Sequence, residues 1–237
     1  KKLLTFLFVA SSLNVHATDY YLSPTGDDNS GAGTLASPWF SLNKVWSVMA
    51  NNTGHNIYMR GGTYAFTTQQ ILTGKSGTAG NLIKIQPYQN EVVILTKSSG
   101  FTFTIERAGI YQQLSNYIHW YNIRVTGYTQ VSDQVINGLM AEQSSNCIFE
   151  RLEVDNNGGG LNIRFDAKNN LIKNCDFHDN KDPLSDVPYG NADGLDVGAD
   201  MNGPVGSSRS DNIVTGCRAW NNSDDGFDCW EMLGSVT

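Results

Sequence analysis

The sequence predicts an all-β fold, a right-handed parallel β-helix in which each coil of the solenoid stacks on the coil before it. A segment that opens with Asn and continues with alternating bulky apolar residues occurs four times, beginning at Asn116, Asn146, Asn170 and Asn212. A shorter segment, a glycine followed by an apolar residue, recurs at 160–163, 194–197 and 226–229. The repeats are unequally spaced and no helical pattern separates them, which is typical of similar strands joined by loops of variable length.

The residues before the repeats predict short strands and one helix that covers the open end of the coil. Strands are expected at 19–23, 56–64, 82–88 and 92–96. Between the first two strands, Ser37 is a candidate helix N-cap, and Pro38 suits the first helical position. Apolar residues then recur at helical spacing, so we expect a short N-terminal capping helix near 38–50.

Stacked coils place equivalent residues of neighbouring repeats about 4.8 Å apart, so that these residues form ladders. Cys175 and Cys217 occupy the same position in two repeats, which favours an inward-pointing stack of thiols over a disulfide. Asn156, Asn180 and Asn222 also coincide, and we expect their side chains to satisfy backbone groups in a turn.

The first 17 residues have the pattern of a secretory signal peptide. Two lysines precede an apolar run, and Ala17 ends a candidate cleavage site. The apolar run is too short to span a bilayer. We therefore expect a signal peptide at 1–17, a β-helix domain at 18–237 and a secreted or periplasmic location. The repeat pattern still runs near residue 237, so we expect a fragment whose domain is incomplete at the C-terminus.

The charge of the chain argues against several classes of partner. The 237 residues carry a formal net charge of −7, which disfavours unaided binding to nucleic acid or to an anionic membrane. Seventeen of the 23 acidic residues are aspartates, and eleven of these lie between Asp176 and Asp228. The four cysteines lack the CxxC spacing of zinc sites. We expect a monomer that binds neither nucleic acid nor membrane.

The densest group of acids is expected to form a metal site across two coils. Aligning the short segments at 194 and 226 places Asp193 beside Asp225. The same alignment places Asp196 beside Asp228, and Asp224 adds another acid at the turn. Carboxylates at coil spacing repel one another unless a cation lies between them, and aspartate oxygens without His or Cys favour Ca²⁺. Two alternatives stay open: some of these aspartates cap turns, and Asp196 is a ligand, a neighbour of a ligand or an outward-facing residue.

The same residues carry a family resemblance. The stretch NADG, followed by CRAWNNSDDGFD, resembles the calcium-site region of the family 9 polysaccharide lyases, which are pectate-lyase-type enzymes built on a right-handed parallel β-helix. The segments YYLSPTGDDNSGAGTLASPWFSLNKV and NIYMRGGTY resemble the opening region of many secreted β-helix proteins. The resemblance implies that four aspartates bind Ca²⁺, namely Asp193, Asp224, Asp225 and Asp228.

The resemblance also implies a reaction, the β-elimination of pectic uronate polymers such as pectate or rhamnogalacturonan, with a lysine as the base. In the family, this lysine lies in a coil after the acidic motif. No Lys follows Asp228 here, and Lys168, Lys173 and Lys181 precede the motif and do not match the family position. The catalytic base is therefore unassigned, and we expect it beyond this fragment.

Two other functions fit the same scaffold. A polygalacturonase-like glycoside hydrolase would need no metal, and would hold two carboxyl groups about 6.5 to 9.5 Å apart. A noncatalytic glycan-binding or adhesin β-helix would use aromatic side chains. Trp220, Phe227 and Trp230 could stack on sugars, although their alternation with polar residues favours packing in the core. The long match through CRAWNNSDDG favours the lyase.

Overall fold

The computed structural model of the chain describes residues 17–102, 108–198, 211–229 and 236–237. The expected signal peptide lies outside the described residues except for Ala17. The described residues form parallel β-strands, one α-helix and one short 3-10 helix, η1 (Tyr88–Asn90). In this part of the chain, neither helix has the length and apolar character that a membrane crossing requires.

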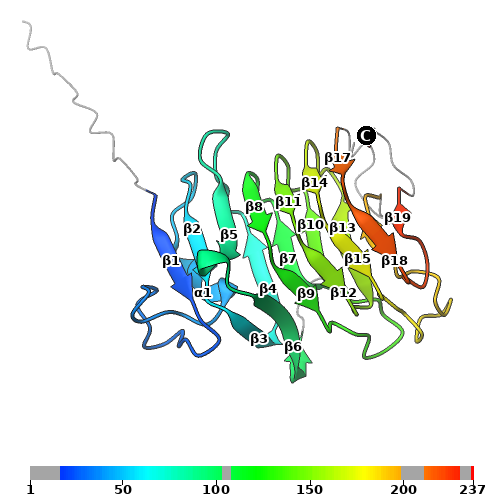
Figure 1. Cartoon of the computed structure of the whole chain (residues 1–237), viewed down its shortest axis with the longest axis horizontal. Helices are drawn as coiled ribbons and strands as arrows, with labels where there is room; N and C mark the ends of the chain where they lie inside the picture. Colours follow the sequence, from blue (N-terminus) through cyan, green and yellow to red (C-terminus); the bar gives the residue numbers. More distant parts are fainter. Residues whose placement is uncertain (1–16, 103–107, 199–210, 230–235) are drawn as a thin grey trace, which may run out of the picture.

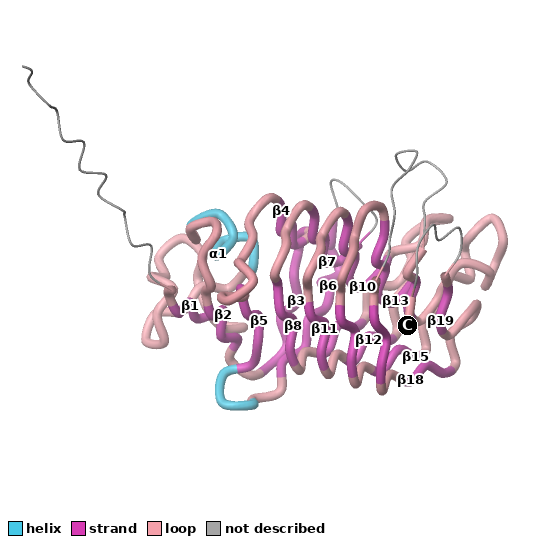
Figure 2. The backbone as a smooth tube through the Cα atoms, turned by 90° about the horizontal axis from the view of Figure 1, so that it is seen from above, coloured by secondary structure: helices cyan, strands magenta, loops and turns pink. Residues whose placement is uncertain are grey.

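Three parallel sheets run along the molecule, and successive coils add strands to each of them (Figures 1 and 2). Sheet one contains, in spatial order, β1 (Asp19–Leu22), β2 (Asn56–Met59), β5 (Ile83–Pro87), β8 (Ile118–Tyr121), β11 (Ile148–Glu150), β14 (Leu171–Lys173) and β17 (Ile213–Thr215). Sheet two contains β4 (Gln70–Thr73), β7 (Ala108–Gln113), β10 (Asn137–Glu142), β13 (Gly159–Arg164), β16 (Leu195–Asp196) and β19 (Phe227–Asp228). Sheet three contains β3 (Gly62–Thr68), β6 (Val93–Thr102), β9 (Arg124–Thr126), β12 (Glu153–Asp155), β15 (Asp176–His178) and β18 (Arg218–Trp220). The prediction of a parallel β-helix is confirmed.

Each long repeat of the sequence spans two strands that belong to different sheets. In the third repeat, β14 lies in sheet one and β15 in sheet three, and Asn174 between them has a φ of 55°. The equivalent turn positions in the other repeats are held by Asn122, Arg151 and Gly216, also with positive φ. One left-handed residue turns the chain from one sheet to the next. Asparagine and glycine commonly adopt this conformation, whereas Arg151 gives no such signal in the sequence.

The predicted cysteine ladder is confirmed. The register of β15 with β18 places Cys175 beside Cys217 on neighbouring coils, and the Cys175 N–H donates to Cys217 Sγ at 3.4 Å. Both cysteines are free thiols, and Cys175 is buried, so the pair contributes packing and not a crosslink.

The predicted asparagine ladder exists, but one of its three members was wrong. Asn157, and not Asn156, stands in line with Asn180 and Asn222, and its N–H donates to Asn180 Oδ1 at 3.1 Å. The Asn180 N–H donates in turn to Asn222 Oδ1 at 3.2 Å. The pairing of β12 with β15 places Asp155 opposite His178. The second repeat is therefore offset by one residue from the alignment that starts each repeat at its first Asn. Asn156 instead takes a positive φ of 52° in the turn.

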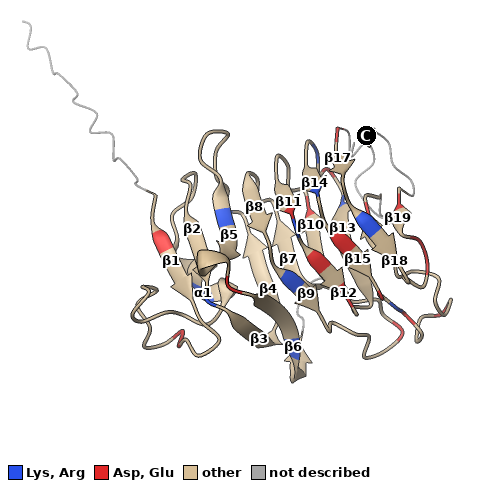
Figure 3. Ribbon diagram, in the orientation of Figure 1, with Lys and Arg blue, Asp and Glu red and all other residues tan. Residues whose placement is uncertain are grey.

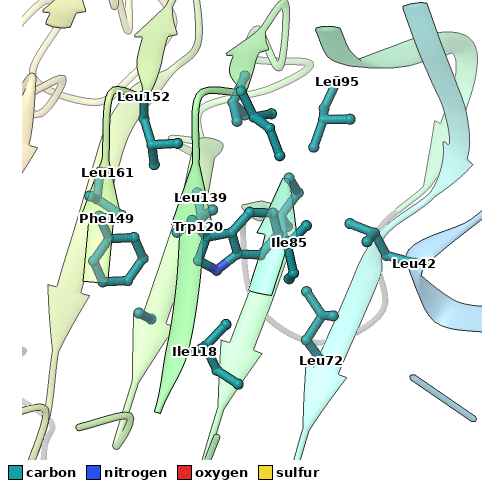
Figure 4. Packing of buried hydrophobic residues seen from close by; sticks show 14 of the residues in the cluster. Leu42, Leu72, Ile85, Leu95, Ile118, Trp120, Leu139, Phe149, Leu152 and Leu161 are labelled. Carbon is teal, nitrogen blue, oxygen red and sulfur yellow. The ribbon is translucent and has the colours of Figure 1, made fainter. Parts of the chain in front are cut away.

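Inward-facing side chains fill the coil and form one continuous core (Figure 4). In sheet one, Ile85, Trp120 and Phe149 stack in register, and Leu139 and Leu161 do the same in sheet two. All five are buried. Each buried aliphatic or Phe side chain contributes roughly 1.5–3 kcal/mol, so the stacking of coils is the main source of stability.

The helix is shorter than predicted and starts later. It is α1 (Leu42–Val48), and its N-cap is Ser41, whose side chain accepts a hydrogen bond within the first turn. Ser37 is not the cap, because the residues after it are extended: the Trp39 N–H donates to the Tyr21 carbonyl at 3.0 Å beside β1. Pairing with β1 therefore holds this segment outside the helix.

The predicted capping role of the helix is confirmed. Asn43 of α1 accepts a hydrogen bond from the Ile71 N–H at its Oδ1 (2.6 Å), and the Asn43 N–H donates to Gln70 Oε1 at 3.2 Å. These two residues belong to β4, the strand at the edge of sheet two. The helix thus satisfies backbone groups that an open sheet edge would expose.

Candidate metal centre

Two neighbouring loops carry three of the four predicted ligands. The loop 179–194 joins β15 to β16 and carries Asp193, and the loop 221–226 joins β18 to β19 and carries Asp224 and Asp225. Because β15 pairs with β18 and β16 pairs with β19, the two loops bridge the same sheets on adjacent coils. Most of the acidic residues lie in this half of the molecule (Figure 3).

Glycines allow the backbones of these loops to approach closely. The Gly194 N–H donates to the Asp225 carbonyl at 3.0 Å, and a Cβ at Gly194 would lie 2.7 Å from the Gly226 carbonyl oxygen. A Cβ at Gly160, on the preceding coil, would lie 1.9 Å from the Gly194 carbonyl oxygen. A side chain does not fit at either position, which explains the glycine that begins the first two short repeats.

The structure brings Asp193, Asp224 and Asp225 together. Each offers a carboxylate oxygen that lies within 4.8 Å of those of the other two. The Asp225 N–H also donates to Asp193 Oδ1 at 3.1 Å, and the Asp224 N–H donates to the Ala192 carbonyl at 3.4 Å. These bonds fix the two loops to each other independently of any ion.

The fourth predicted ligand, Asp228, lies beside this group. It is in β19, in register with Asp196 of β16, and it is not among the three mutually close carboxylates. Its charge nevertheless raises the pKa of both Asp193 and Asp224. Asp196 also lies outside the close group, and its Oδ2 accepts a hydrogen bond from Asn162 Nδ2 at 2.8 Å.

Electrostatic strain is concentrated on Asp193. Burial, followed by the negative charges of Asp228, Asp224 and Asp225, raises the pKa of Asp193 to about 7, although the Asp225 N–H opposes this rise. Burial and neighbouring aspartates also raise the pKa of Asp224. Among the described residues, every charge that acts on these two pKa values belongs to an aspartate. The centre therefore has the charge distribution of a cation site.

The donor set suits a hard divalent cation. Its ligands are carboxylate oxygens on loops, and neither His nor Cys belongs to the close group. Ca²⁺ accepts six to eight oxygen ligands in flexible geometry, whereas zinc prefers nitrogen and sulfur. Backbone carbonyls, water and substrate oxygens would complete such a coordination shell. The residues present thus fit the calcium that the sequence predicted.

Three lysines precede the acidic motif, and none of them is assigned as the base of this centre. Lys168 pairs with Asp166 at 2.8 Å, and Lys173 pairs with Glu150 at 3.2 Å. Lys181 is exposed at the start of the long loop. The assignment of the catalytic base stays open.

A second acidic group lies outside the predicted site. Glu153, Asp155 and His178 offer ligand atoms within 4.8 Å of one another on sheet three. Arg124 already neutralises this group, because its Nε and Nη2 donate to the two Asp155 oxygens at 2.8 and 2.7 Å. With Arg124 this cluster is an ion-pair network that spans three neighbouring coils, β9, β12 and β15, and the sequence did not predict it.

The three aromatic residues near the acidic motif differ in their placement. The prediction that Trp220 packs in the core was wrong, because Ala219 takes the inward position of β18. The Trp220 ring lies outside, stacked on His178 at 4.2 Å between ring centroids, and is 39% exposed. Phe227 contacts a buried Phe edge-on at 6.4 Å and is 47% exposed. Trp230 lies outside the described residues.

The coil and the acidic centre define a class of protein, a parallel β-helix with an oxygen-only candidate cation site. A family model described as "Pel9A-like, right handed beta helix region" matches residues 20–237. The chain therefore belongs to the Pel9A-like right-handed β-helix family, the polysaccharide lyase family 9 type that the sequence resembles.

Individual relatives agree with this assignment. Pectate lyase PEL9 of Emericella nidulans is 30% identical over 244 residues, which cover 98% of this chain and 54% of the relative. Pectate lyase L of Dickeya chrysanthemi is 26% identical, covering 92% of this chain and 48% of the relative. The chain spans about half the length of the curated relatives it matches.

Solved structures show the same fold. A rhamnogalacturonan lyase superimposes with a TM-score of 0.74 at 26% identity, covering 93% of this chain and 55% of that one. The pectate lyase Pel9A gives a TM-score of 0.71 at 25% identity, with 93% and 52% covered.

Proposed function

We propose that this chain carries the calcium-binding part of a secreted polysaccharide lyase that cleaves pectic uronate polymers by β-elimination. The supporting observation is the convergence of Asp193, Asp224 and Asp225 on adjacent coils, with carboxylate oxygens within 4.8 Å of one another. Carboxylates held this close favour a cation strongly. The matched relatives are named pectate lyases and a rhamnogalacturonan lyase, so both polymers belong to the proposal.

The chemistry of uronates explains why such a site is useful. β-Elimination removes the proton at C5 of the sugar and expels the oxygen at C4, but that proton is weakly acidic because it lies beside a negative carboxylate. Bound Ca²⁺ would neutralise this carboxylate and stabilise the negative charge that develops when the proton leaves. Asp193, Asp224 and Asp225 would hold the ion, with Asp228 adding charge beside them.

The acids also govern whether the substrate can approach. In the metal-free chain, the aspartates repel a polyanionic polymer. With the divalent ion held by the same residues, the local charge becomes attractive for a uronate carboxylate. The residues of this chain hold the carboxylates of two loops close together. The base that would take the proton is unassigned.

The geometry fits a hydrolase less well. An inverting glycosidase holds its two carboxyl groups about 6.5 to 9.5 Å apart with water between them. The three carboxylates of this centre have oxygens within 4.8 Å of one another, which is closer than that separation. A noncatalytic glycan-binding protein would use the same scaffold without a base, so product formation distinguishes it from the lyase.

Calcium binding and product formation test the proposal together. Titration calorimetry of the protein with CaCl₂ at pH 8 should show binding, which Asp225→Asn weakens and the exposed control Asp186→Asn leaves unchanged. With polygalacturonate or rhamnogalacturonan, the protein should produce the ultraviolet absorbance of an unsaturated uronate, and EDTA should abolish it. New reducing ends without this absorbance, insensitive to EDTA, would identify a hydrolase instead. Absence of both calcium binding and absorbance on every pectic polymer would refute the lyase.

Secretion is part of the proposal and rests on residues 1–17, which have the pattern of a cleavable leader. Mass spectrometry of the protein expressed with these residues should find a mature N-terminus at Thr18 in the exported fraction. An uncleaved protein retained in the cytoplasm would contradict the proposal.

A further inference from the structure

Asp182 is a fully buried carboxylate in the long loop that precedes Asp193, and the sequence did not single it out. Its exposed fraction is 0%. Its two oxygens accept hydrogen bonds from two separate stretches of chain: Ser223 Oγ donates to Oδ1 at 2.9 Å, and Asn191 Nδ2 donates to Oδ2 at 3.2 Å. One carboxylate thus connects residues that lie on neighbouring coils.

Both donors lie next to predicted metal ligands. Ser223 directly precedes Asp224, and Asn191 is two residues before Asp193. The Ser223 N–H also donates to the Asn180 carbonyl at 3.0 Å, so Ser223 is fixed at its backbone and at its side chain. Asp182 therefore adds a side-chain link between the two loops that carry the predicted ligands.

This arrangement is costly for the fold. Among the described residues, the two side chains that donate to Asp182 are both neutral, and burial of a carboxylate without a cation is unfavourable. The negative charge of Asp182 also adds to the repulsion at the site, because it is one of the causes that raise the pKa of Asp224. Apolar side chains would pack the loop at lower cost, so stability alone does not account for an acid at this position.

We propose that Asp182 is a positioning residue, which clamps the loops that carry Asp193 and Asp224 at the separation that calcium binding needs. This inference rests on the calcium site of the proposed function. Asp182 is not itself a ligand: it is not among the three carboxylates that meet at the centre. It acts through Ser223 and Asn191, as the groups that orient metal ligands commonly do.

The test uses variants that separate the effect of the loop positions from the effect of the charge on Asp182. Ser223→Ala removes one hydrogen bond of the clamp and leaves every charge in place. Asp182→Ala removes both side-chain hydrogen bonds of the clamp, whereas Asp182→Asn removes the charge and keeps both bonds, because its amide donates to Ser223 Oγ while its oxygen accepts from Asn191 Nδ2. Asp186→Asn is the matched control, because it removes an exposed acid of the same loop.

Calcium titration calorimetry is the first measurement. Ser223→Ala and Asp182→Ala should each weaken Ca²⁺ binding by about 10-fold to 100-fold. Asp182→Asn should bind Ca²⁺ more tightly than Asp182→Ala, and Asp186→Asn should bind like the original protein. Unchanged affinity in Ser223→Ala, or equal losses in Asp182→Asn and Asp182→Ala, would overturn the clamp.

Hydrogen exchange of the metal-free protein is the second measurement, and it does not depend on calcium. Ser223→Ala and Asp182→Ala should speed amide exchange in 191–195 and 223–228, while exchange in β12 stays unchanged. If the original protein binds no Ca²⁺, the proposed function fails, and the exchange data still decide whether the clamp exists. Exchange that is unchanged in both loops would refute the clamp even in a protein that binds calcium.

Discussion

Replacement of Asp193 by Asn should stabilise the metal-free chain at alkaline pH while it abolishes calcium binding. Asp193 is the member of the centre whose pKa is raised to about 7, through burial and the charges of Asp228, Asp224 and Asp225. Asparagine keeps the Oδ1 that accepts the Asp225 N–H, and removes only the charge. The variant therefore isolates the electrostatic cost of the site.

The sign and size of the effect follow from linkage. The ordinary pKa of an Asp is 3.8, so between about pH 4 and pH 7 the folded chain holds a proton on Asp193 that the unfolded chain has released. The free energy of unfolding of the metal-free chain therefore falls as the pH rises through this window, and the loss is complete above pH 7. A pKa difference of about three corresponds to about 4 kcal/mol, which solvent screening of a partly exposed group reduces to roughly 2–3 kcal/mol.

Thermal unfolding in EDTA measures this difference. At pH 8, Asp193→Asn should melt roughly 4–12 °C above the original chain, and the gap should close as the pH approaches 4. Asp186→Asn, which removes an exposed acid, should follow the original chain at every pH. Parallel pH profiles for Asp193→Asn and the original chain would show that the aspartates do not repel one another in the fold.

Two further substitutions test contacts within the fold. Gly194→Ala places a methyl group within 2.7 Å of a backbone oxygen and should destabilise the chain by about 1–3 kcal/mol in urea, whereas Gly80→Ala, which meets nothing within 4 Å, should not. Arg124→Ala leaves the buried Asp155 without its cation and should cost about 3–5 kcal/mol in the same assay, whereas Arg218→Ala, whose ion pair is exposed, should cost less than about 1 kcal/mol. An equal loss of stability in Gly194→Ala and Gly80→Ala, or in Arg124→Ala and Arg218→Ala, would contradict the structure.

The fold was predictable because each coil of a solenoid has the same arrangement of strands, so the same apolar pattern recurs along the chain. Several different strands with the same apolar alternation can bury their inward faces only against each other, so the repeats determine the architecture. Local details were less predictable. Ser37 and Ser41 are both plausible caps in the sequence, and only the pairing of Trp39 with β1 decides between them. The shift of the asparagine ladder from Asn156 to Asn157 begins earlier in the repeat, because strand pairing aligns Ile148 with Leu171 and so places Cys147, and not Asn146, in line with Asn170.

The candidate centre was predictable where neighbouring coils repeat a motif, and not where they differ. Asp193 and Asp225 follow from the register of two similar short segments. Asp182 has no counterpart in another repeat, and its partners Ser223 and Asn191 are 41 and 9 residues away. No periodic pattern connects these positions, so only the folded loop shows that they meet.

The assembly of the centre from two coils links metal binding to the stacking of those coils. Asp193 belongs to one coil and Asp224 to the next, so the cation site exists only while β19 is paired with β16. Without metal, repulsion between these carboxylates works against that pairing, and an ion that binds only the paired state stabilises it by about 2.7 kcal/mol at a hundredfold excess over Kd. Amides of β19 should therefore exchange roughly 100-fold more slowly with saturating Ca²⁺ at pH 8, while β2, far along the coil, should exchange at the same rate with and without the ion. Equal slowing in β2 and β19 would mean that calcium stabilises the whole chain by another route, and no slowing in β19 would mean that the two loops do not share an ion.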